Sequence, residues 1–296
     1  MVCEVICVWL ILAFLSAGFA AMSTVLAKLG EKDIDSTFAT FLRTGVVLIF
    51  SWAIVLATGK IGQIGQISFS AWLFLVLSGL ATGGSWLCYF RALQLGNAGS
   101  VAAVDKTSTV LTVILAFIIF DEKVTPVRIV AIVLMLAGAL LVAYDGGKSK
   151  AADDKPHKRQ WLLYAVLSAV FAALTSVLAK LGIRDIDSNL ATAIRTVVVL
   201  LMSGIMIPIK SRGKTMVVPK GRQALLLVLS GVATGGSWLC YFNALQTGQA
   251  SVVVPVDKLS IVLIAVFSRL FLKEKLSAYS VTGLSAVTVG TLLMLL

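Results

Sequence analysis

Two nearly identical stretches decide the fold: LVLSGLATGGSWLCYFRALQ (Leu75 to Gln94) and LVLSGVATGGSWLCYFNALQ (Leu227 to Gln246). Eighteen of their twenty positions are identical, and 152 residues separate the two. A self-similarity of this kind indicates that one unit has been duplicated. The same separation relates other pairs along the chain: Arg43 and Arg195, Asp105-Lys106 and Asp257-Lys258, Lys28 and Lys180, and Glu122 and Glu274.

The duplication divides the chain into two units of similar length. We expect a first five-helix repeat at 1–145, a basic polar linker at 146–160 and a second five-helix repeat at 161–296. The first apolar run resembles a signal peptide, but it matches an internal run of the second copy, which cannot be a cleaved leader. We therefore interpret the first run as a membrane span.

The composition excludes most soluble classes of protein. Of the 296 residues, 59% are hydrophobic and 13% are charged, and the mean hydropathy is +0.99. A soluble domain carries about 25% charged residues. The net charge of +11 is concentrated between apolar runs, where it indicates membrane topology and lipid head-group contacts rather than nucleic-acid binding. The lipid bilayer is thus an expected partner, and nucleic acid is not.

Each copy contains five apolar runs of about 20 residues, the length of helix that crosses ~30 Å of hydrocarbon. A unit with an odd number of spans enters on one side and leaves on the other, so the second copy must be inserted upside down. The sequence therefore predicts an all-α integral membrane protein with ten transmembrane helices in two inverted-topology repeats. The expected spans are 5–29, 36–58, 70–95, 100–120, 126–144, 161–182, 189–209, 224–246, 252–272 and 277–296.

Basic residues indicate the orientation in a cell (inner) membrane. Fourteen lysines and arginines in the breaks between spans fall on one side, and five fall on the other. The richer side is expected to be cytoplasmic. This places both termini outside and the 146–160 linker in the cytoplasm.

Charged and aromatic residues inside the spans are the candidate site. A charge at mid-helix costs about 2.5–3.5 kcal/mol on insertion scales and is tolerated where it faces a cavity or a partner. Tyr89 and Asp105 each lie eight residues from Asn97 in a tight turn, and so at the same depth. We predict that a substrate cavity is lined by Trp86, Tyr89, Asp105, Lys106, Trp238, Tyr241, Asp257 and Lys258. Arg43 and Arg195 are predicted to pair with these charges as gates.

Other interpretations of these residues remain open at this stage. The aspartates and arginines also fit structural ion pairs, and the aromatic residues also fit an ordinary helix core. The two TGGS segments favour close helix packing, although a hinge is possible. Glu122 and Glu274 are interpreted as interfacial loop residues, and Lys28 and Lys180 as side chains that reach toward lipid head groups.

The whole chain resembles the drug/metabolite transporter superfamily in its ten-span form with two EamA-type domains. The resemblance rests on GGSWLCYFRALQ followed by VDKTS, on GGSWLCYFNALQ followed by VDKLS, and on FDEK and LKEK after the fourth spans. It implies a cavity formed mainly by spans 1, 3, 4, 6, 8 and 9. Small multidrug exporters carry a membrane-embedded Glu in their first span, but here that span has only Glu4 at its start, so their proton/drug exchange does not carry over.

The function that we predict is secondary active transport, export or exchange, of a small polar metabolite by alternating access. An amino acid-like zwitterion ranks first because acidic and basic groups occur together. Alternatives are an organic-anion or phosphorylated-metabolite antiporter and, in another class, a lipid scramblase or flippase or a non-transporting scaffold. A coupling proton is possible, and the protein is expected to be a monomer or a homodimer.

Enzymatic chemistry is not expected. The chain carries neither HExxH nor GxSxG nor a phosphate-binding P-loop, and its only histidine, His157, lies in the linker. The four cysteines form no zinc or disulfide pattern. We therefore predict no catalytic residue, no metal and no cofactor.

Overall fold

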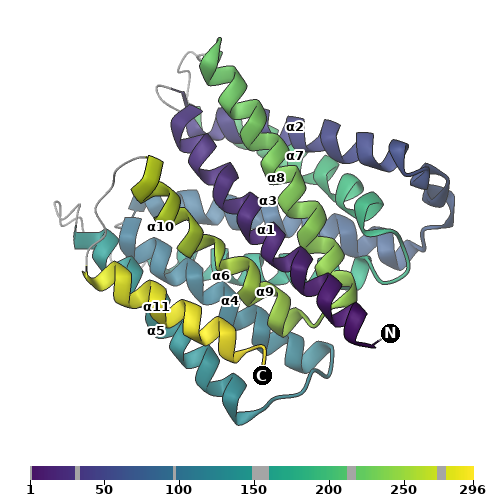
Figure 1. Cartoon of the computed structure of the whole chain (residues 1–296). Coiled ribbons are helices and arrows are strands. Elements are labelled where there is room, and N and C mark those ends of the chain that lie inside the picture. The colour runs from purple at the N-terminus through teal and green to yellow at the C-terminus, as the bar shows by residue number, and fades with distance from the viewer. Residues whose placement is uncertain (1, 31–33, 96–97, 149–159, 212–217, 272–277) are drawn as a thin grey trace.

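The computed structural model describes residues 2–30, 34–95, 98–148, 160–211, 218–271 and 278–296, and the ordered elements within these ranges are helices (Figure 1). Seven helices of this part are long and apolar enough to cross a membrane, and three shorter helices are also apolar. The predicted all-helical fold is confirmed. The elements are α1 (Val2–Gly30), α2 (Ser36–Ala57), the 3-10 helix η1 (Lys60–Gln66), α3 (Phe69–Leu95), α4 (Ala98–Ile119), α5 (Pro126–Lys148), α6 (Gln160–Gly182), α7 (Ser188–Ser211), α8 (Arg222–Thr247), α9 (Ala250–Lys258), α10 (Ser260–Phe271) and α11 (Ala278–Leu293).

Equivalent residues begin equivalent helices in the two repeats. The side chain of Asp35 accepts hydrogen bonds from the first free N–H groups of α2, and Asp187 does the same for α7. An aspartate in this position satisfies backbone donors that have no partner inside the helix. The duplicated sequence therefore reproduces the same local structure 152 residues further on.

Helices from opposite repeats pack antiparallel at the centre of the bundle. Along α1 and α8, Ser16 meets Ser237 at 3.2 Å and Ser23 meets Ser230 at 3.2 Å, so residue numbers rise in one helix as they fall in the other. The equivalent pair, α3 and α6, repeats this pattern in which small hydroxyl side chains join close-packed helices. Because α1 and α8 would run parallel if both repeats had the same orientation, the antiparallel packing confirms the inverted repeat.

The TGGS segments lie where helices of the two repeats pack closely against each other. A Cβ atom on Gly83 of α3 would lie 2.6 Å from the Met202 side chain of α7, and one on Gly235 of α8 would lie 2.6 Å from the Phe50 ring of α2. Neither distance is compatible with a side chain at the glycine. These contacts favour the packing interpretation of the two segments.

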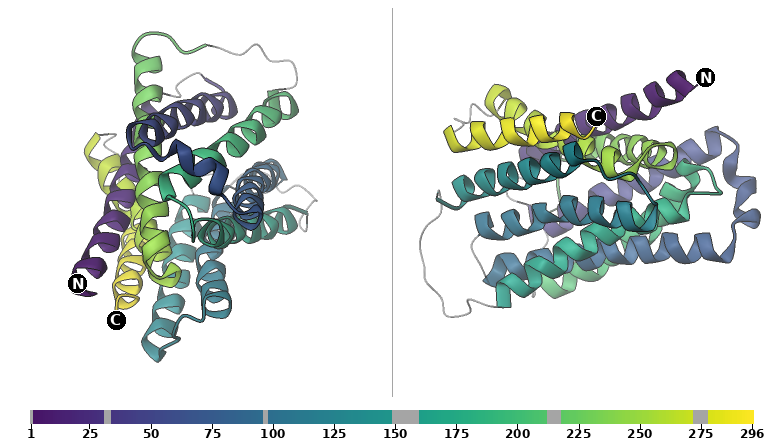
Figure 2. Two further views of the ribbon diagram at one scale, coloured as in Figure 1. Left: turned by 90° about the vertical axis from the view of Figure 1, so that its right-hand side faces the viewer. Right: turned by 90° about the horizontal axis from the view of Figure 1, so that it is seen from below.

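The last helix of each repeat forms a pair of its own. Figure 2 shows α5 and α11 side by side along one flank of the bundle. Gly138 of α5 and Gly290 of α11 occupy equivalent positions and bring the two backbones together: a Cβ on Gly138 would lie 2.5 Å from the carbonyl oxygen of Gly283. The two repeats are thus joined both at the centre and along this flank.

The ninth span differs from its counterpart in the first repeat. We expected one continuous run at 252–272, but the structure has α9 and α10 with a break at Leu259, whereas α4 is continuous. Pro255 stands where the first repeat has Ala103. Proline has no N–H and crowds the preceding turn, and the Leu259 N–H bonds to Val256 three residues back instead of four. Pro255 lies one turn before the break, but a proline perturbs the turn that precedes it, so this sequence difference does not by itself account for the bond at Leu259.

Candidate functional site

A cavity of about 360 Å³ lies at the centre of the bundle, between helices of both repeats. Six of the predicted site residues line it, five of them from the second repeat: Trp86, Arg195, Trp238, Tyr241, Asp257 and Lys258. Trp238 lies ten residues from Gly248 at the end of α8, which places it near the middle of the span. We call this space the central cavity.

The two predicted aspartates have equivalent surroundings. The hydroxyl of Ser16 donates to Asp257 at 2.6 Å, and the hydroxyl of Ser168 donates to Asp105 at 3.0 Å. Each carboxylate therefore accepts a hydrogen bond from the opposite repeat. Asp257 also lies 3.7 Å from the ammonium group of its neighbour Lys258. Of the two aspartates, only Asp257 is among the residues that line the central cavity in the described part of the chain.

The two arginines are held by hydroxyl groups. Arg195 of α7 donates from Nε to Ser78 at 2.9 Å and from Nη2 to Thr82 at 2.7 Å. Its equivalent, Arg43 of α2, donates from Nη2 to Ser23 at 2.9 Å and to Thr234 at 3.1 Å. In each case the hydroxyls of a TGGS helix from the opposite repeat help to hold the guanidinium group. Arg195 and Asp257 share the central cavity, whereas the contacts above place Arg43 against α1 and α8 and Asp105 against α6.

The remaining candidates divide in the same way. Tyr241 donates from its hydroxyl to Ser176 at 2.9 Å and lines the central cavity. Its equivalent, Tyr89, packs instead with Trp161 and Tyr164 of α6. The side chain of Lys106 lies outside the described part of the structure. The structure thus brings together the candidates of the second repeat with Trp86, and places the other first-repeat candidates elsewhere.

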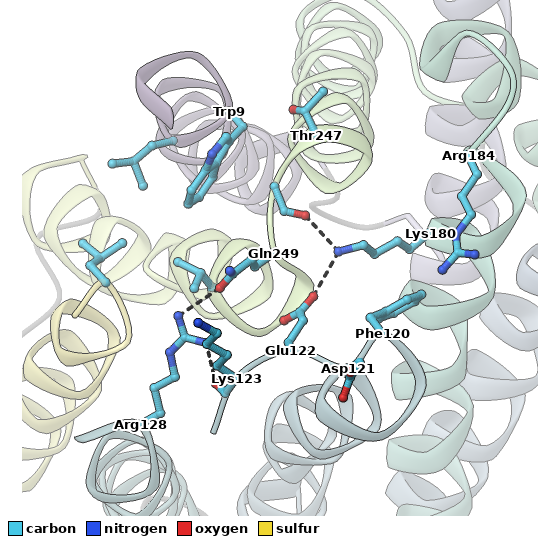
Figure 3. Close-up of a pocket in the computed structure, with 14 residues that line it drawn as sticks. Trp9, Phe120, Asp121, Glu122, Lys123, Arg128, Lys180, Arg184, Thr247 and Gln249 are labelled. Carbon is cyan, nitrogen blue, oxygen red and sulfur yellow. Dashed lines mark hydrogen bonds and ion pairs between the residues drawn. The ribbon is translucent and has the colours of Figure 1, made fainter. Parts of the chain in front are cut away.

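A second, larger cavity of about 1060 Å³ lies at the end of the bundle where α1 begins and α11 ends (Figure 3). Trp9 and Phe120 contribute aromatic surface. Basic side chains outnumber acidic ones around it: the basic residues are Lys123, Arg128, Lys180 and Arg184, and the acidic residues are Asp121 and Glu122. The ammonium group of Lys180 lies 4.7 Å from the centroid of the Phe120 ring. We call this space the end cavity.

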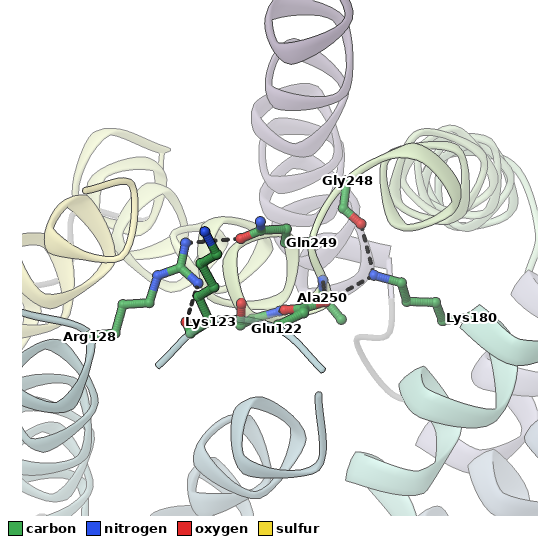
Figure 4. A network of polar contacts seen from close by, with 8 residues as sticks. Glu122, Lys123, Arg128, Lys180, Gly248, Gln249 and Ala250 are labelled. Atoms are coloured by element: carbon green, nitrogen blue, oxygen red, sulfur yellow. Dashed lines mark hydrogen bonds and ion pairs between the residues drawn. The ribbon is translucent and has the colours of Figure 1, made fainter. Parts of the chain in front are cut away.

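A buried network closes the floor of the end cavity (Figure 4). Glu122, between α4 and α5, accepts from Lys180 at 3.1 Å and from the N–H groups of Ala250 and Ser251 at 2.8 and 2.9 Å. Lys180 also donates to the carbonyl oxygen of Gly248 at 2.8 Å. One loop of the first repeat is therefore bound to α6 and to the α8–α9 turn of the second. We call these five residues the Glu122 network.

Arg128 adds a further connection between the repeats at this end. It donates from Nη1 to the carbonyl oxygen of Lys123 at 2.8 Å and from Nη2 to the side-chain oxygen of Gln249 at 2.9 Å. Because Arg128 lies in the first turn of α5 and Gln249 begins α9, both the α4–α5 loop and the start of α5 are bonded to the α8–α9 turn.

Sequence reasoning did not identify the Glu122 network. Glu122 was expected to be a loop residue and Lys180 to extend toward lipid head groups, but their side chains are only 6% and 14% exposed and bind each other. The signal that was available is the exact recurrence of both residues in the second copy as Glu274 and Lys28. Glu274 lies outside the described residues.

The Glu122 network is expected to stay intact at neutral pH. Burial raises the pKa of Glu122, but hydrogen bonding from Ser251, whose backbone N–H donates to the carboxylate, and the charge of Lys180 outweigh it and hold the pKa below its ordinary value of 4.5. A carboxylate with a lowered folded-state pKa contributes stability above its unfolded pKa and loses it as pH falls through the folded value. The difference in Tm between the protein and Glu122→Gln should therefore be constant from about pH 6 to 8 and shrink below pH 4.5. A decrease already between about pH 7 and 6 would contradict this ionisation state.

Comparisons with known proteins agree with this architecture. A solved crystal structure superposes with a TM-score of 0.80 over 97% of this chain and 96% of its own, at 16% sequence identity, and so shares the fold. An uncharacterized transporter of Archaeoglobus fulgidus is 23% identical over 93% of this chain and 94% of its own length. An uncharacterized transporter from the cobO 3' region of Sinorhizobium sp is 48% identical over 46% of this chain and 96% of its own length. The human protein named solute carrier family 35 member G1 is 24% identical over 76% of this chain and 61% of its own length.

The model of the EamA-like transporter family matches the chain twice, at residues 8–144 and 159–296. The two matches cover both repeats, and the relatives named as transporters include one that extends over nearly the whole chain. The family is one of membrane transporters and not of enzymes. This chain therefore belongs to the EamA-like transporter family, as a multi-pass membrane protein with two EamA domains.

Proposed function

We propose that this protein is a secondary active transporter that moves a small polar metabolite through the central cavity by alternating access. The observation that carries the proposal is the cavity itself, which lies between the two repeats and combines Arg195, Asp257 and Lys258 with aromatic side chains. Charged side chains inside a membrane protein are costly and are retained where a ligand or a pathway uses them. Substrate sites of inverted-repeat transporters lie at this position, between the halves and near the midplane.

An amino acid-like zwitterion is the first choice of substrate. Arg195 offers a positive charge and Asp257 a negative charge in one cavity, and Tyr241 lies within electrostatic reach of both. An organic anion or a phosphorylated metabolite is the second choice, favoured by the excess of positive charge. The direction that we propose is export or exchange, driven by a solute or proton gradient.

The Glu122 network is proposed to be the closed gate at one end of the pathway. It joins the two repeats in the lining of the end cavity, and helices α6 and α8 line both the end cavity and the central cavity. Release of substrate toward this end requires Glu122 to separate from Lys180 and from the first N–H groups of α9. From the distribution of basic residues we propose that this end, where α1 begins and α11 ends, faces outward and that the 146–160 linker is cytoplasmic.

Transport by purified protein in lipid vesicles tests the proposal. Vesicles are loaded in turn with labelled amino acids, organic anions and phosphorylated sugars, and efflux is measured with and without a pH gradient. We expect one class to be transported, and Asp257→Asn to lower its initial rate about tenfold or more, because a buried charge loses its role in binding or coupling. Asp105→Asn should act in the same direction, and the double variant should be the least active.

Asp185→Asn, in the exposed loop after α6, is the matched control and should transport at the unaltered rate. Unchanged transport in Asp105→Asn, Asp257→Asn and the double variant would remove both aspartates from the mechanism. Movement of fluorescent lipids between leaflets, with no transport of a soluble solute, would replace the proposal with a lipid flippase or scramblase. No movement of either kind would leave a non-transporting membrane protein.

A further inference from the structure

Arg195 is a buried cation with an unused hydrogen-bonding edge. It is 3% exposed and lies in α7, inside a segment apolar enough to span the membrane. Nε and Nη2 donate to Ser78 and Thr82, but Nη1 is buried and has no hydrogen-bond partner among the residues that the structure describes. A guanidinium group carries five N–H donors and releases its proton only at very high pH, so this edge is a donor that protein groups leave unsatisfied.

The positive charge of Arg195 is also left without an acidic partner in the described part of the structure. The nearby carboxylate of Asp257 accepts from Ser16 and lies against Lys258, and no ion pair joins it to Arg195. The charged residues that line the central cavity are Arg195, Asp257 and Lys258, which together carry one net positive charge. Because an uncompensated charge inside a membrane protein costs several kcal/mol, the central cavity is suited to bind one negative charge.

The surroundings of Arg195 favour a planar anion. The guanidinium carbon lies 4.5 Å from the centroid of the Phe242 ring and 5.3 Å from that of Trp238. With these rings against the group and two nitrogens bonded to hydroxyls, the nitrogen left to bind an anion is Nη1, which is itself buried, so small movements of the lining side chains must admit the anion. A carboxylate matches a guanidinium edge in shape and brings one negative charge, whereas a phosphate monoester brings about 1.5–2.

We infer that Arg195 binds the carboxylate group of the transported substrate, which makes the substrate a monocarboxylate, with or without an amino group. This inference rests on the proposed transport function and identifies the chemical class of its substrate. It also assigns the anion to the second repeat in this conformation, because Arg195 lines the central cavity and the equivalent Arg43 does not. Phosphorylated metabolites, the alternative substrates named above, are thereby excluded at this site.

Ligand-induced thermal stabilisation of the purified full-length protein tests the inference without requiring transport. The probes are acetate, glycine, methylamine and inorganic phosphate at matched ionic strength: acetate lacks the amino group of glycine, and methylamine lacks its carboxylate. A ligand that binds the folded state raises its stability in proportion to the logarithm of its concentration above Kd. We expect acetate or glycine to raise Tm, and methylamine and phosphate to leave it unchanged.

Arg195→Gln should raise the Kd of the carboxylate probe at least tenfold, which corresponds to about 1.4 kcal/mol. Arg195→Lys should raise this Kd less, because lysine keeps the positive charge although it lacks the planar guanidinium edge. If Arg195→Gln does not fold, Arg195→Lys is measured in its place. Arg43→Gln is the same change at the equivalent position, and its effect should be at least fivefold smaller. If glycine binds and Asp257→Asn weakens glycine but not acetate, the substrate is a zwitterion; if acetate alone binds, it is a simple organic anion.

Three outcomes would overturn the inference: stabilisation by methylamine or phosphate alone, no stabilisation by any probe, or a carboxylate effect of equal size in Arg195→Gln. Failure of the transport proposal is distinguishable from these results. Arg195-dependent carboxylate binding without solute movement in vesicles would reject transport and keep the anion site. Solute transport without that binding would reject the anion site and keep transport.

Discussion

Glu122→Gln is expected to destabilise the protein by about 3 kcal/mol, because it removes one partner of a buried ion pair and leaves the other charged. Lys180 would keep its contact with the Gly248 carbonyl oxygen but lose its carboxylate, in a site where its side chain is 14% exposed. The amide that replaces the carboxylate still accepts hydrogen bonds, so the loss lies at the low end of the range for broken buried pairs. The change in stability is measured by thermal unfolding of the purified protein, with size-exclusion chromatography to monitor how much folded protein remains.

The neighbouring acid provides a matched control for Glu122. Asp121 is exposed, and Asp121→Asn removes the same charge one residue earlier. The backbone of Asp121 is left-handed, with φ of 52°, and asparagine adopts this conformation readily. We expect its effect to stay within about 0.5 kcal/mol. The double variant Glu122→Gln with Lys180→Met should recover part of the loss, since neither charge then remains. Equal effects at positions 121 and 122 would mean that only net charge matters at this end.

Gly138→Ala is expected to cost about 1–3 kcal/mol, because the added methyl group meets backbone atoms that cannot move away easily. Its Cβ would lie 2.5 Å from the carbonyl oxygen of Gly283 and 2.8 Å from the backbone nitrogen of Val287. The α5–α11 pair would have to separate, and the repeats would lose their contact along this flank. The same unfolding measurement applies.

Gly45→Ala is the control for this substitution. Gly45 lies inside α2, and a Cβ there has no atom within 4 Å. Alanine in a helix is favoured over glycine by about 0.5–1 kcal/mol, so Gly45→Ala should leave stability unchanged or raise it. If Gly138→Ala is as harmless as Gly45→Ala, α5 and α11 do not pack in the protein as closely as the structure has them.

Much of the fold could be predicted from the sequence because the duplication constrains it strongly. The odd number of spans per copy requires an inverted repeat, and the apolar runs coincide with the helices: 36–58 was expected where α2 covers Ser36–Ala57. The break at Leu259 was missed because hydropathy does not report the hydrogen-bond pattern of the backbone. Pro255, where the first repeat has Ala103, marks this stretch as different from its counterpart but does not locate the break.

The site was harder to predict because the sequence indicates how deep a residue lies in the membrane but not which way its side chain points around the helix axis. Arg43 and Asp105 were expected to form one cluster from their depth, but their hydrogen-bond partners lie on different helices. Tyr89 and Tyr241 occupy equivalent positions in the two copies, yet only Tyr241 lines the central cavity in the described structure. A symmetric sequence cannot tell which copy faces the cavity in a given conformation.

The sequence similarity of the two repeats also has a thermodynamic consequence for the transport cycle proposed above. A conformation in which the repeats exchange their roles would keep the contacts made by residues common to both copies, and its free energy would differ through the many positions where the copies differ, such as Ala103 and Pro255. The closer two such states lie in free energy, the smaller is the difference in ligand affinity that shifts their populations. In the transport cycle proposed above, the contacts common to both repeats favour neither side of the membrane, and any preference for one side comes from the positions where the copies differ.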